Sequence, residues 1–180
     1  MTWRPLAALL TLAIVAISCG PAPPSAPEGP RPSVVAGNAT TAPLLPRHAD
    51  ALPASDPDRF ARLLDQLRGT PVLVNVWGSW CPPCEEEMPR LVAAHAEYGD
   101  RVQFVGIDIL DSRTEARAFI AEHGIRFPSV FDVDDAIKPS LGQFGQPVTV
   151  FYDREGAFVT SWAGPIPEDR LLRALRRIAG

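Results

Sequence analysis

The sequence predicts an α/β domain built on one mixed β-sheet with helices on both faces. Strand-like and helix-like segments alternate over residues 57–180, which is typical of parallel strands joined by helical crossovers. Two strand-like segments near the C-terminus are joined by a Gly-containing turn at 153–156, which indicates an antiparallel hairpin. The central strands show no polar alternation, so helices must cover both of their faces.

Each element can be placed from its boundary residues and its apolar spacing. Asp56 and Pro57 are typical of a helix start, and that helix ends at Gly69. Residues 71–77 form a nearly continuous β-branched strand, and a helix follows over 81–98. The remaining elements are, in order, a strand at 102–109, a helix at 112–124, an extended piece at 127–132, an irregular helix at 134–145 broken near Pro139, strands at 147–153 and 157–164, and an amphipathic C-terminal helix.

The chain length and charge limit the classes of partner. The 180 residues suit one globular unit, and we expect a monomer. The formal net charge is −4, and the basic residues are scattered among acidic ones. This composition argues against nucleic acid as a partner.

Residues 1–19 are predicted to be a signal peptide. Arg4 precedes an apolar run from Leu6 to Ile17, and small residues follow. The run is about a dozen residues, whereas a helix that crosses a membrane needs roughly twenty. An uncleaved membrane anchor is therefore the weaker alternative.

The end of this segment, Ala16 to Cys19, resembles the lipobox of bacterial lipoproteins, in which the cysteine is lipidated and becomes the first residue of the mature chain. Ala16 stands where leucine is usual, and an ordinary signal peptide with an incidental cysteine is the alternative. Lipidation of Cys19 would anchor the chain to the outside of the cell membrane. Cys81 and Cys84 would then be the remaining thiols, in a compartment where disulfides persist.

Residues 20–56 are predicted to be a Pro-rich linker, and residues 57–180 the folded domain. The linker holds nine of the chain's 20 prolines, with few large apolar residues between them. Such a composition cannot bury enough surface to offset the entropy of ordering, so we expect an extended spacer. The alternative is that part of it, with the stretch at Val34 first, packs on the domain.

The pair Cys81 and Cys84 carries the chemistry. Cys81 lies just before a predicted helix, where free backbone N–H groups and the helix dipole favour a thiolate. Pro82 and Pro83 suit the first helical turn, where an N–H is not needed. We therefore expect Cys81 to be the nucleophile, and Cys84, one turn later, to be the thiol that resolves a mixed disulfide.

Two thiols at this spacing have three other uses in proteins. A structural disulfide would close too short a loop to stabilise the fold much. A zinc site lacks its second pair of ligands, and neither His95 nor His123 has the required spacing. A two-thiolate copper(I) site, in a binding protein without turnover, remains an alternative.

Four stretches resemble the TlpA/ResA-type branch of the thioredoxin superfamily, the extracytoplasmic thiol-disulfide oxidoreductases. They are VLVNVWGSWCPPCEEEMP, FPSVFD, GQFGQPVTVFYDREG and WAGPIPEDRLLRAL, and the resemblance runs from about Asp58 to the C-terminus. It implies a thioredoxin-like fold with a mixed sheet of four to five strands flanked by helices on both faces. It implies no cofactor.

The resemblance also implies substrate-binding residues. Pro147 matches a cis-proline that faces the dithiol, and the backbone of Gln146 before it would pair with the substrate chain. Trp80 matches a tryptophan beside the nucleophile. With Pro82 and Pro83, these are the candidate substrate-binding residues. A trans proline at the start of an ordinary strand, and simple packing of Trp80, are the alternatives.

Glu87 is the third candidate catalytic residue. It follows Cys84 by three residues, on the same helix face. The resemblance to the TlpA/ResA-type branch implies that a glutamate at this position tunes thiol acidity. A buried carboxylate there would disfavour the thiolate of Cys84 or relay its proton. The alternative is that the glutamates at 85–87 are all solvated. Asn75 occupies the strand position of a buried acid in cytoplasmic thioredoxin, which leaves Glu87 or water as a base.

We expect a membrane-tethered, extracytoplasmic domain that reduces disulfides in proteins. The C-x-x-C motif alone does not fix the direction of electron flow, because the reduction potentials of such pairs span about 150 mV. The reducing direction is what the resemblance implies, and a disulfide oxidase is the alternative. The expected partners are disulfide-bonded proteins, with an apocytochrome c as one candidate, and a membrane thiol donor of electrons.

Overall fold

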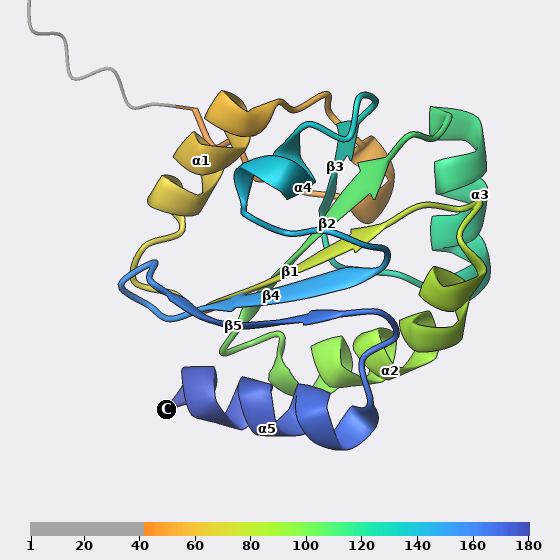
Figure 1. Cartoon of the computed structure of the whole chain (residues 1–180). Coiled ribbons are helices and arrows are strands. Elements are labelled where there is room, and N and C mark those ends of the chain that lie inside the picture. Colours follow the sequence, from red (N-terminus) through yellow and green to blue (C-terminus); the bar gives the residue numbers. More distant parts are fainter. Residues whose placement is uncertain (1–41) are drawn as a thin grey trace, which may run out of the picture. The chain divides into compact units, whose positions relative to one another are not determined.

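The computed structural model describes residues 42–180, which form one five-stranded sheet. The strands are β1 (Val72–Trp77), β2 (Gln103–Ile109), β3 (Ser129–Asp132), β4 (Val148–Tyr152) and β5 (Phe158–Ala163). Their order across the sheet is β3-β2-β1-β4-β5 (Figure 1). β1, β2 and β3 are parallel, while β4 is antiparallel to β1 and β5 is antiparallel to β4. The expected mixed sheet is confirmed, with five strands.

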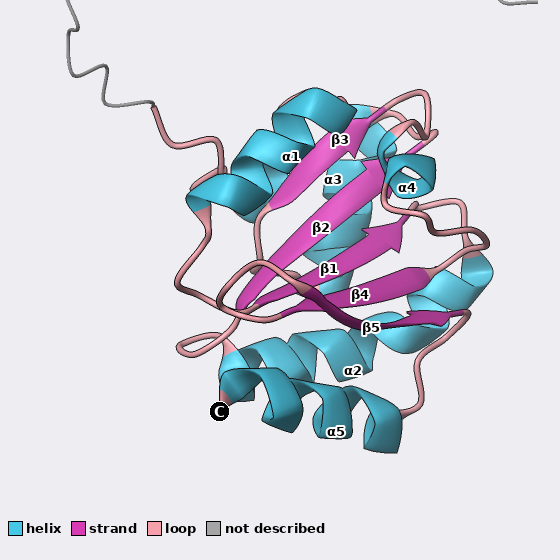
Figure 2. Cartoon of the chain, turned by 60° about the vertical axis from the view of Figure 1, so that its left-hand side comes forward, coloured by secondary structure: helices cyan, strands magenta, loops and turns pink. Residues whose placement is uncertain are grey.

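Helices pack on both faces of this sheet. They are the 3₁₀ helix η1 (Ala49–Ala51), α1 (Pro57–Gln66), α2 (Pro82–Tyr98), α3 (Arg113–His123), α4 (Ile137–Ser140) and α5 (Glu168–Ala179). One apolar cluster joins the sheet to α2, α3 and α5, and a second joins the other face to α1 and α4. Figure 2 shows the sheet between these two groups of helices.

The central strand β1 is buried along its whole length. Leu73 and Trp77 belong to the cluster on the α2 side, and Val74 and Val76 to the cluster on the α1 side. Because side chains alternate along a strand, Asn75 points to the same side as Leu73 and Trp77. The alternation thus directs one polar side chain of β1 toward α2.

The helices begin at the caps that the sequence predicts. The Asp56 carboxylate accepts a hydrogen bond from the Arg59 N–H (2.7 Å), and the Ser112 hydroxyl accepts one from the Glu115 N–H (3.2 Å). Each cap satisfies a backbone donor that the first helical turn leaves free. Gly124 ends α3 in the left-handed region, with φ at 66°.

The folded unit begins earlier than the sequence predicts. Residues 42–56, which we assign to the linker, pack against the domain: Leu52 is fully buried, and the backbone on either side of it reaches the edge strand β3. Phe131 N–H donates to the Pro53 carbonyl and Ser55 N–H donates to the Phe131 carbonyl, both at 2.9 Å. Proline lacks a donor but keeps its acceptor, so a Pro-rich composition did not prevent this pairing.

The remaining N-terminal predictions lie outside the described residues. These are the signal peptide, Cys19, and the linker up to residue 41. Between residues 42 and 180, no helix is both long enough and apolar enough to cross a membrane.

Candidate active site

Cys81 and Cys84 lie at the start of α2 and are joined by a disulfide. Cys81 is the N-cap residue, and its sulfur accepts a hydrogen bond from the Cys84 N–H at 3.3 Å. Pro82 and Pro83 occupy the first helical turn, as expected. Pro82 and Pro83 have no N–H, so the Cys84 N–H and the helix dipole are what favour negative charge on the Cys81 sulfur. Cys84 is fully buried and Cys81 is nearly so, at 2% exposed.

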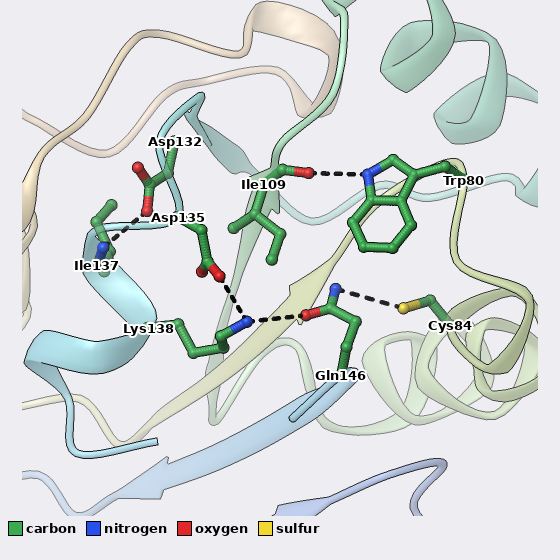
Figure 3. Close-up of polar contacts among 8 residues, drawn as sticks. All are labelled: Trp80, Cys84, Ile109, Asp132, Asp135, Ile137, Lys138 and Gln146. Atoms are coloured by element: carbon green, nitrogen blue, oxygen red, sulfur yellow. Dashed lines mark hydrogen bonds and ion pairs between the residues drawn. The ribbon is translucent and has the colours of Figure 1, made fainter. Parts of the chain in front are cut away.

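A second loop reaches the dithiol from β4. The Gln146–Pro147 peptide bond is cis, as the resemblance implies. The side chain of Gln146 extends from this loop, and its Nε2 donates to the Cys84 sulfur at 3.6 Å (Figure 3). The geometry therefore brings the cis-proline loop to Cys84, although Gln146 follows Cys84 by 62 residues in the chain.

Trp80 stands beside the dithiol, half exposed. Its indole Nε1 donates to the Ile109 carbonyl at 3.1 Å, which holds the ring against the end of β2 (Figure 3). Gly78 makes room for this pose, because a Cβ there would lie 2.7 Å from the indole nitrogen. The ring is thus anchored at one end and presents its remaining surface to solvent, so packing and substrate contact are compatible.

Glu87 is fully buried on α2, whereas Glu85 and Glu86 are exposed. One carboxylate oxygen accepts from Asn75 Nδ2 (2.7 Å) and the other from the Ile166 N–H (2.9 Å). Burial raises the pKa of Glu87 to about 7, against the lowering effect of these two hydrogen bonds. A carboxyl group that changes charge near neutral pH therefore lies one helical turn after Cys84.

Asn75 connects Glu87 to the loop side of the site. Its Nδ2 also lies 3.3 Å from Thr149 Oγ1, on the strand that follows the cis-proline. Asn75 and Thr149 are directly paired across β1 and β4. The amide that replaces an acid at this position thus acts as a donor to Glu87.

Sequence reasoning missed an ion pair, formed by a buried lysine and a partly buried aspartate, on the other side of Gln146. Lys138, in α4, is 9% exposed, and its Nζ lies 2.7 Å from a carboxylate oxygen of Asp135. The same ammonium donates to Gln146 Oε1 at 3.5 Å (Figure 3). In the sequence, Lys138 stands in an irregular segment with nothing to connect it to a dithiol more than fifty residues earlier.

A second buried acid lies near the loop that carries Trp80. Asp108, on β2, is fully buried, and burial together with the negative charge of Asp111 raises its pKa to about 9. Asp111 accepts a hydrogen bond from the Ser79 N–H at 2.6 Å. At neutral pH Asp108 is therefore protonated, and the charge of Asp111 holds the backbone before the dithiol.

Exposed apolar side chains lie at the sheet edge where β1 leads to the dithiol, and sequence reasoning did not single out most of them. Trp80, Leu110, Val133 and Phe144 are each at least half exposed, and Phe144 is 75% exposed. The first three follow the carboxyl ends of β1, β2 and β3, which meet at one edge because these strands are parallel. Phe144 precedes the cis-proline at the same edge. We call these four residues the apolar rim.

No cluster of three or more potential metal-ligating side chains occurs among residues 42–180. The two sulfurs are in any case bonded to each other. In this state neither sulfur is a thiolate that could bind a metal.

The chain resembles known proteins over most of the described region. Residues 52–160 match the AhpC/TSA family. The thiol-disulfide oxidoreductase ResA of Bacillus thuringiensis (strain Al Hakam) is 28% identical over 116 residues, which are 64% of this chain and 67% of that protein. The thiol:disulfide interchange protein DsbE of Allochromatium vinosum is 38% identical over 103 residues, which are 57% of this chain and 56% of that protein.

Solved structures with the same fold carry related names. A putative thiol:disulfide interchange protein DsbE from Chlorobium tepidum superposes with a TM-score of 0.60 at 26% identity, over 65% of this chain and 85% of that one. A secreted Mycobacterium tuberculosis disulfide oxidoreductase superposes with a TM-score of 0.58 at 28% identity, over 63% and 85%. The expected thioredoxin-like fold is confirmed.

Proposed function

Because the chain belongs to the AhpC/TSA family and is a thiol-disulfide oxidoreductase, we propose that it reduces disulfides in proteins outside the cytoplasm. Cys81 is the nucleophile in this proposal, and Cys84 is the resolving thiol. The observation that carries it is the dithiol at the start of α2, facing the cis-proline loop. That arrangement places the backbone of the cis-proline loop and a redox-active disulfide side by side.

The apolar rim supports a polypeptide as the substrate. Large exposed apolar side chains that gather at one site mark interaction surfaces. Four of the five exposed large apolar side chains among the described residues belong to the rim, and the fifth, Phe158, is at the opposite end of the sheet. In this proposal Trp80 and Phe144 contact the substrate chain, Pro82 and Pro83 border it, and the backbone of Gln146 pairs with it.

Glu87 supports the reducing direction. Above its pKa of about 7 it carries a negative charge near Cys84, and a second charge on that sulfur would then be disfavoured. Disfavouring the thiolate destabilises the reduced state relative to the disulfide. A dithiol with a less stable reduced state is a stronger reductant.

Two partners complete the proposal. A lipid on Cys19 tethers the chain to the membrane, and the linker holds the monomeric domain above the surface. A membrane thiol protein returns two electrons to the disulfide after each turnover, because an oxidising compartment supplies no soluble reductant. An apocytochrome c is one candidate for the substrate. The secreted M. tuberculosis relative supports an extracytoplasmic location.

Trapping of mixed disulfides tests the roles of the two cysteines. Cells that produce the Cys84→Ser chain should accumulate covalent adducts with substrates, because the resolving thiol is gone. The Cys81→Ser chain is the matched control and should form none. Equal trapping by both variants would contradict the assignment.

The equilibrium with glutathione tests the direction. We expect a reduction potential near that of reducing thioredoxin, about −270 mV, and far from about −120 mV for oxidising DsbA. The in-cell state of the pair should be largely dithiol when the membrane donor is present. A pair that stays oxidised in those cells would indicate an oxidase instead.

A further inference from the structure

The Gln146 side chain joins the Cys84 sulfur to a buried ammonium group. Its Nε2 lies 3.6 Å from the sulfur, and its Oε1 lies 3.5 Å from Lys138 Nζ (Figure 3). The three groups therefore form a continuous chain from α4 through the cis-proline loop to α2. Gln146 is partly exposed, whereas Lys138 and Cys84 are buried.

Lys138 determines which end of the Gln146 amide faces the sulfur. An ammonium group has only donors, so the amide must turn its oxygen to Lys138. The NH₂ group then points at Cys84 and can donate to it. Without Lys138 the amide could invert, and its carbonyl oxygen would face the sulfur and oppose negative charge there.

The rest of α4 holds Lys138 in this position. The Asp132 carboxylate accepts from the Ile137 N–H at 2.7 Å, which fixes the first residue of α4 to the end of β3. Asp135, with φ at 53°, is in the left-handed region and places its carboxylate 2.7 Å from Lys138 Nζ. Lys138 is the only lysine of the chain.

Asp135 also limits what Lys138 can do by charge alone. At 2.7 Å the carboxylate largely cancels the field of the ammonium at more distant atoms. Burial of such a pair is weak evidence for a stabilising role, because desolvation offsets the attraction. The orientation of the Gln146 amide is the remaining route from Lys138 to the sulfur.

We propose that Lys138 is a positioning residue for thiol-disulfide exchange, which orients the Gln146 amide to donate to Cys84 as that sulfur becomes a thiolate. The inference rests on the proposed exchange at Cys81 and Cys84. Gln146 itself contacts a reacting atom and is a catalytic residue through its side chain, in addition to the proposed backbone pairing with substrate.

The exchange step places negative charge on Cys84 in both directions. When a donor thiolate attacks the Cys81 sulfur, a bond forms between these two sulfurs and the Cys81–Cys84 bond breaks. Cys84 leaves with the electron pair as a thiolate. In the reverse step the Cys84 thiolate attacks Cys81 in a mixed disulfide and expels the partner's thiolate. A leaving thiolate of lower pKa departs faster, and a hydrogen bond from an amide lowers that pKa.

The anions around this sulfur act in the opposite sense. Glu87 lies one turn further along α2 and disfavours a charge on Cys84 when ionised, and Asp135 lies beyond Lys138. A hydrogen bond from Gln146 therefore offsets part of the effect by which ionised Glu87 makes departure of the thiolate harder. The two side chains act on the same sulfur in opposite directions.

The rate at which dithiothreitol reduces the oxidised full-length chain tests the proposal. Dithiothreitol does not use the apolar rim, so this rate reports on sulfur chemistry and not on substrate binding. Gln146→Leu should lower the second-order rate constant about tenfold, as expected for loss of a hydrogen bond to a charged group. Lys138→Met should lower this rate constant about fivefold, whereas Lys138→Arg, which keeps the positive charge and the donors, should stay within about twofold of wild type.

The double variant identifies the route. If Lys138 acts through Gln146, Lys138→Met should have no further effect in the Gln146→Leu background. Additive losses, or an unchanged rate in either single variant, would overturn the proposal. Gln146→Glu keeps an oxygen that faces Lys138 but removes the donor to Cys84. A wild-type rate in the Gln146→Glu variant would also overturn the proposal, and this test does not require Lys138→Met to fold. If the wild-type chain does not reduce protein disulfides but the variants still show these rate effects, only the proposed function is contradicted.

Discussion

The buried carboxyl group of Glu87 makes a quantitative prediction about stability and pH. Burial raises its pKa from 4.5 to about 7 in the folded state. Between these values the folded chain binds a proton that the unfolded chain has released, so stability falls as the pH rises through this window. At about 1.36 kcal/mol per pH unit, the whole effect is about 3 kcal/mol, and about 2.5 kcal/mol of it falls between pH 5 and pH 8.

Glu87→Gln removes this titration. The variant amide can still accept from Asn75, but it turns a donor toward the Ile166 N–H, which costs about 1–3 kcal/mol at every pH. The stability advantage of wild type over the variant should therefore shrink by about 2.5 kcal/mol from pH 5 to pH 8. Contributions from other titrating groups, Asp108 included, are common to both chains and cancel.

Urea unfolding at pH 5 and pH 8, with the disulfide intact in both chains, measures this difference. With a slope of about 2 kcal/mol per M, the gap between the two midpoints should change by about 1 M. Glu85→Gln is the matched control, because its side chain is exposed on the same helix and, unlike Glu86, it does not contribute to the raised pKa of Glu87. Its gap should change much less between the two pH values. A constant gap for Glu87→Gln would refute the argument that burial dominates the acidity of this carboxyl group.

Two further substitutions test the apolar rim and the packing inside the sheet. Phe144→Ser should raise KM for a protein disulfide about fivefold, since burial of a Phe ring contributes about 1 kcal/mol or more. It should leave the turnover of a small disulfide unchanged. Phe158→Ser is the control at the far end of the sheet and should change neither value. Gly106→Ala should destabilise the fold by about 1–3 kcal/mol in thermal unfolding. The new Cβ would overlap Ser129 Oγ and lie 2.7 Å from Trp77 Nε1. An unchanged Tm would contradict this packing.

The local structure of this chain follows from short-range physics. Asp56 and Ser112 can satisfy free N–H groups wherever they precede a helix, so these two starts were predictable. The apolar run of β1 likewise required burial on both faces. The position of Cys81 at a helix start depends only on its neighbours, and the redox interpretation of the pair followed from it. By contrast, the N-terminal boundary of the domain was predicted too late, because composition alone does not show that Leu52 finds a buried site.

The elements, the dithiol and the face of α2 on which Glu87 lies follow from the amino-acid sequence alone. The burial of Glu87, next to two solvated neighbours, follows instead from the fold, because it depends on Asn75 and on Ile166, 79 residues away. The fold also places Lys138 next to Gln146 and brings the apolar rim to one edge of the sheet. These contacts join segments that are distant along the chain, and both burial and the orientation of an amide are set by what packs around them rather than by adjacent residues.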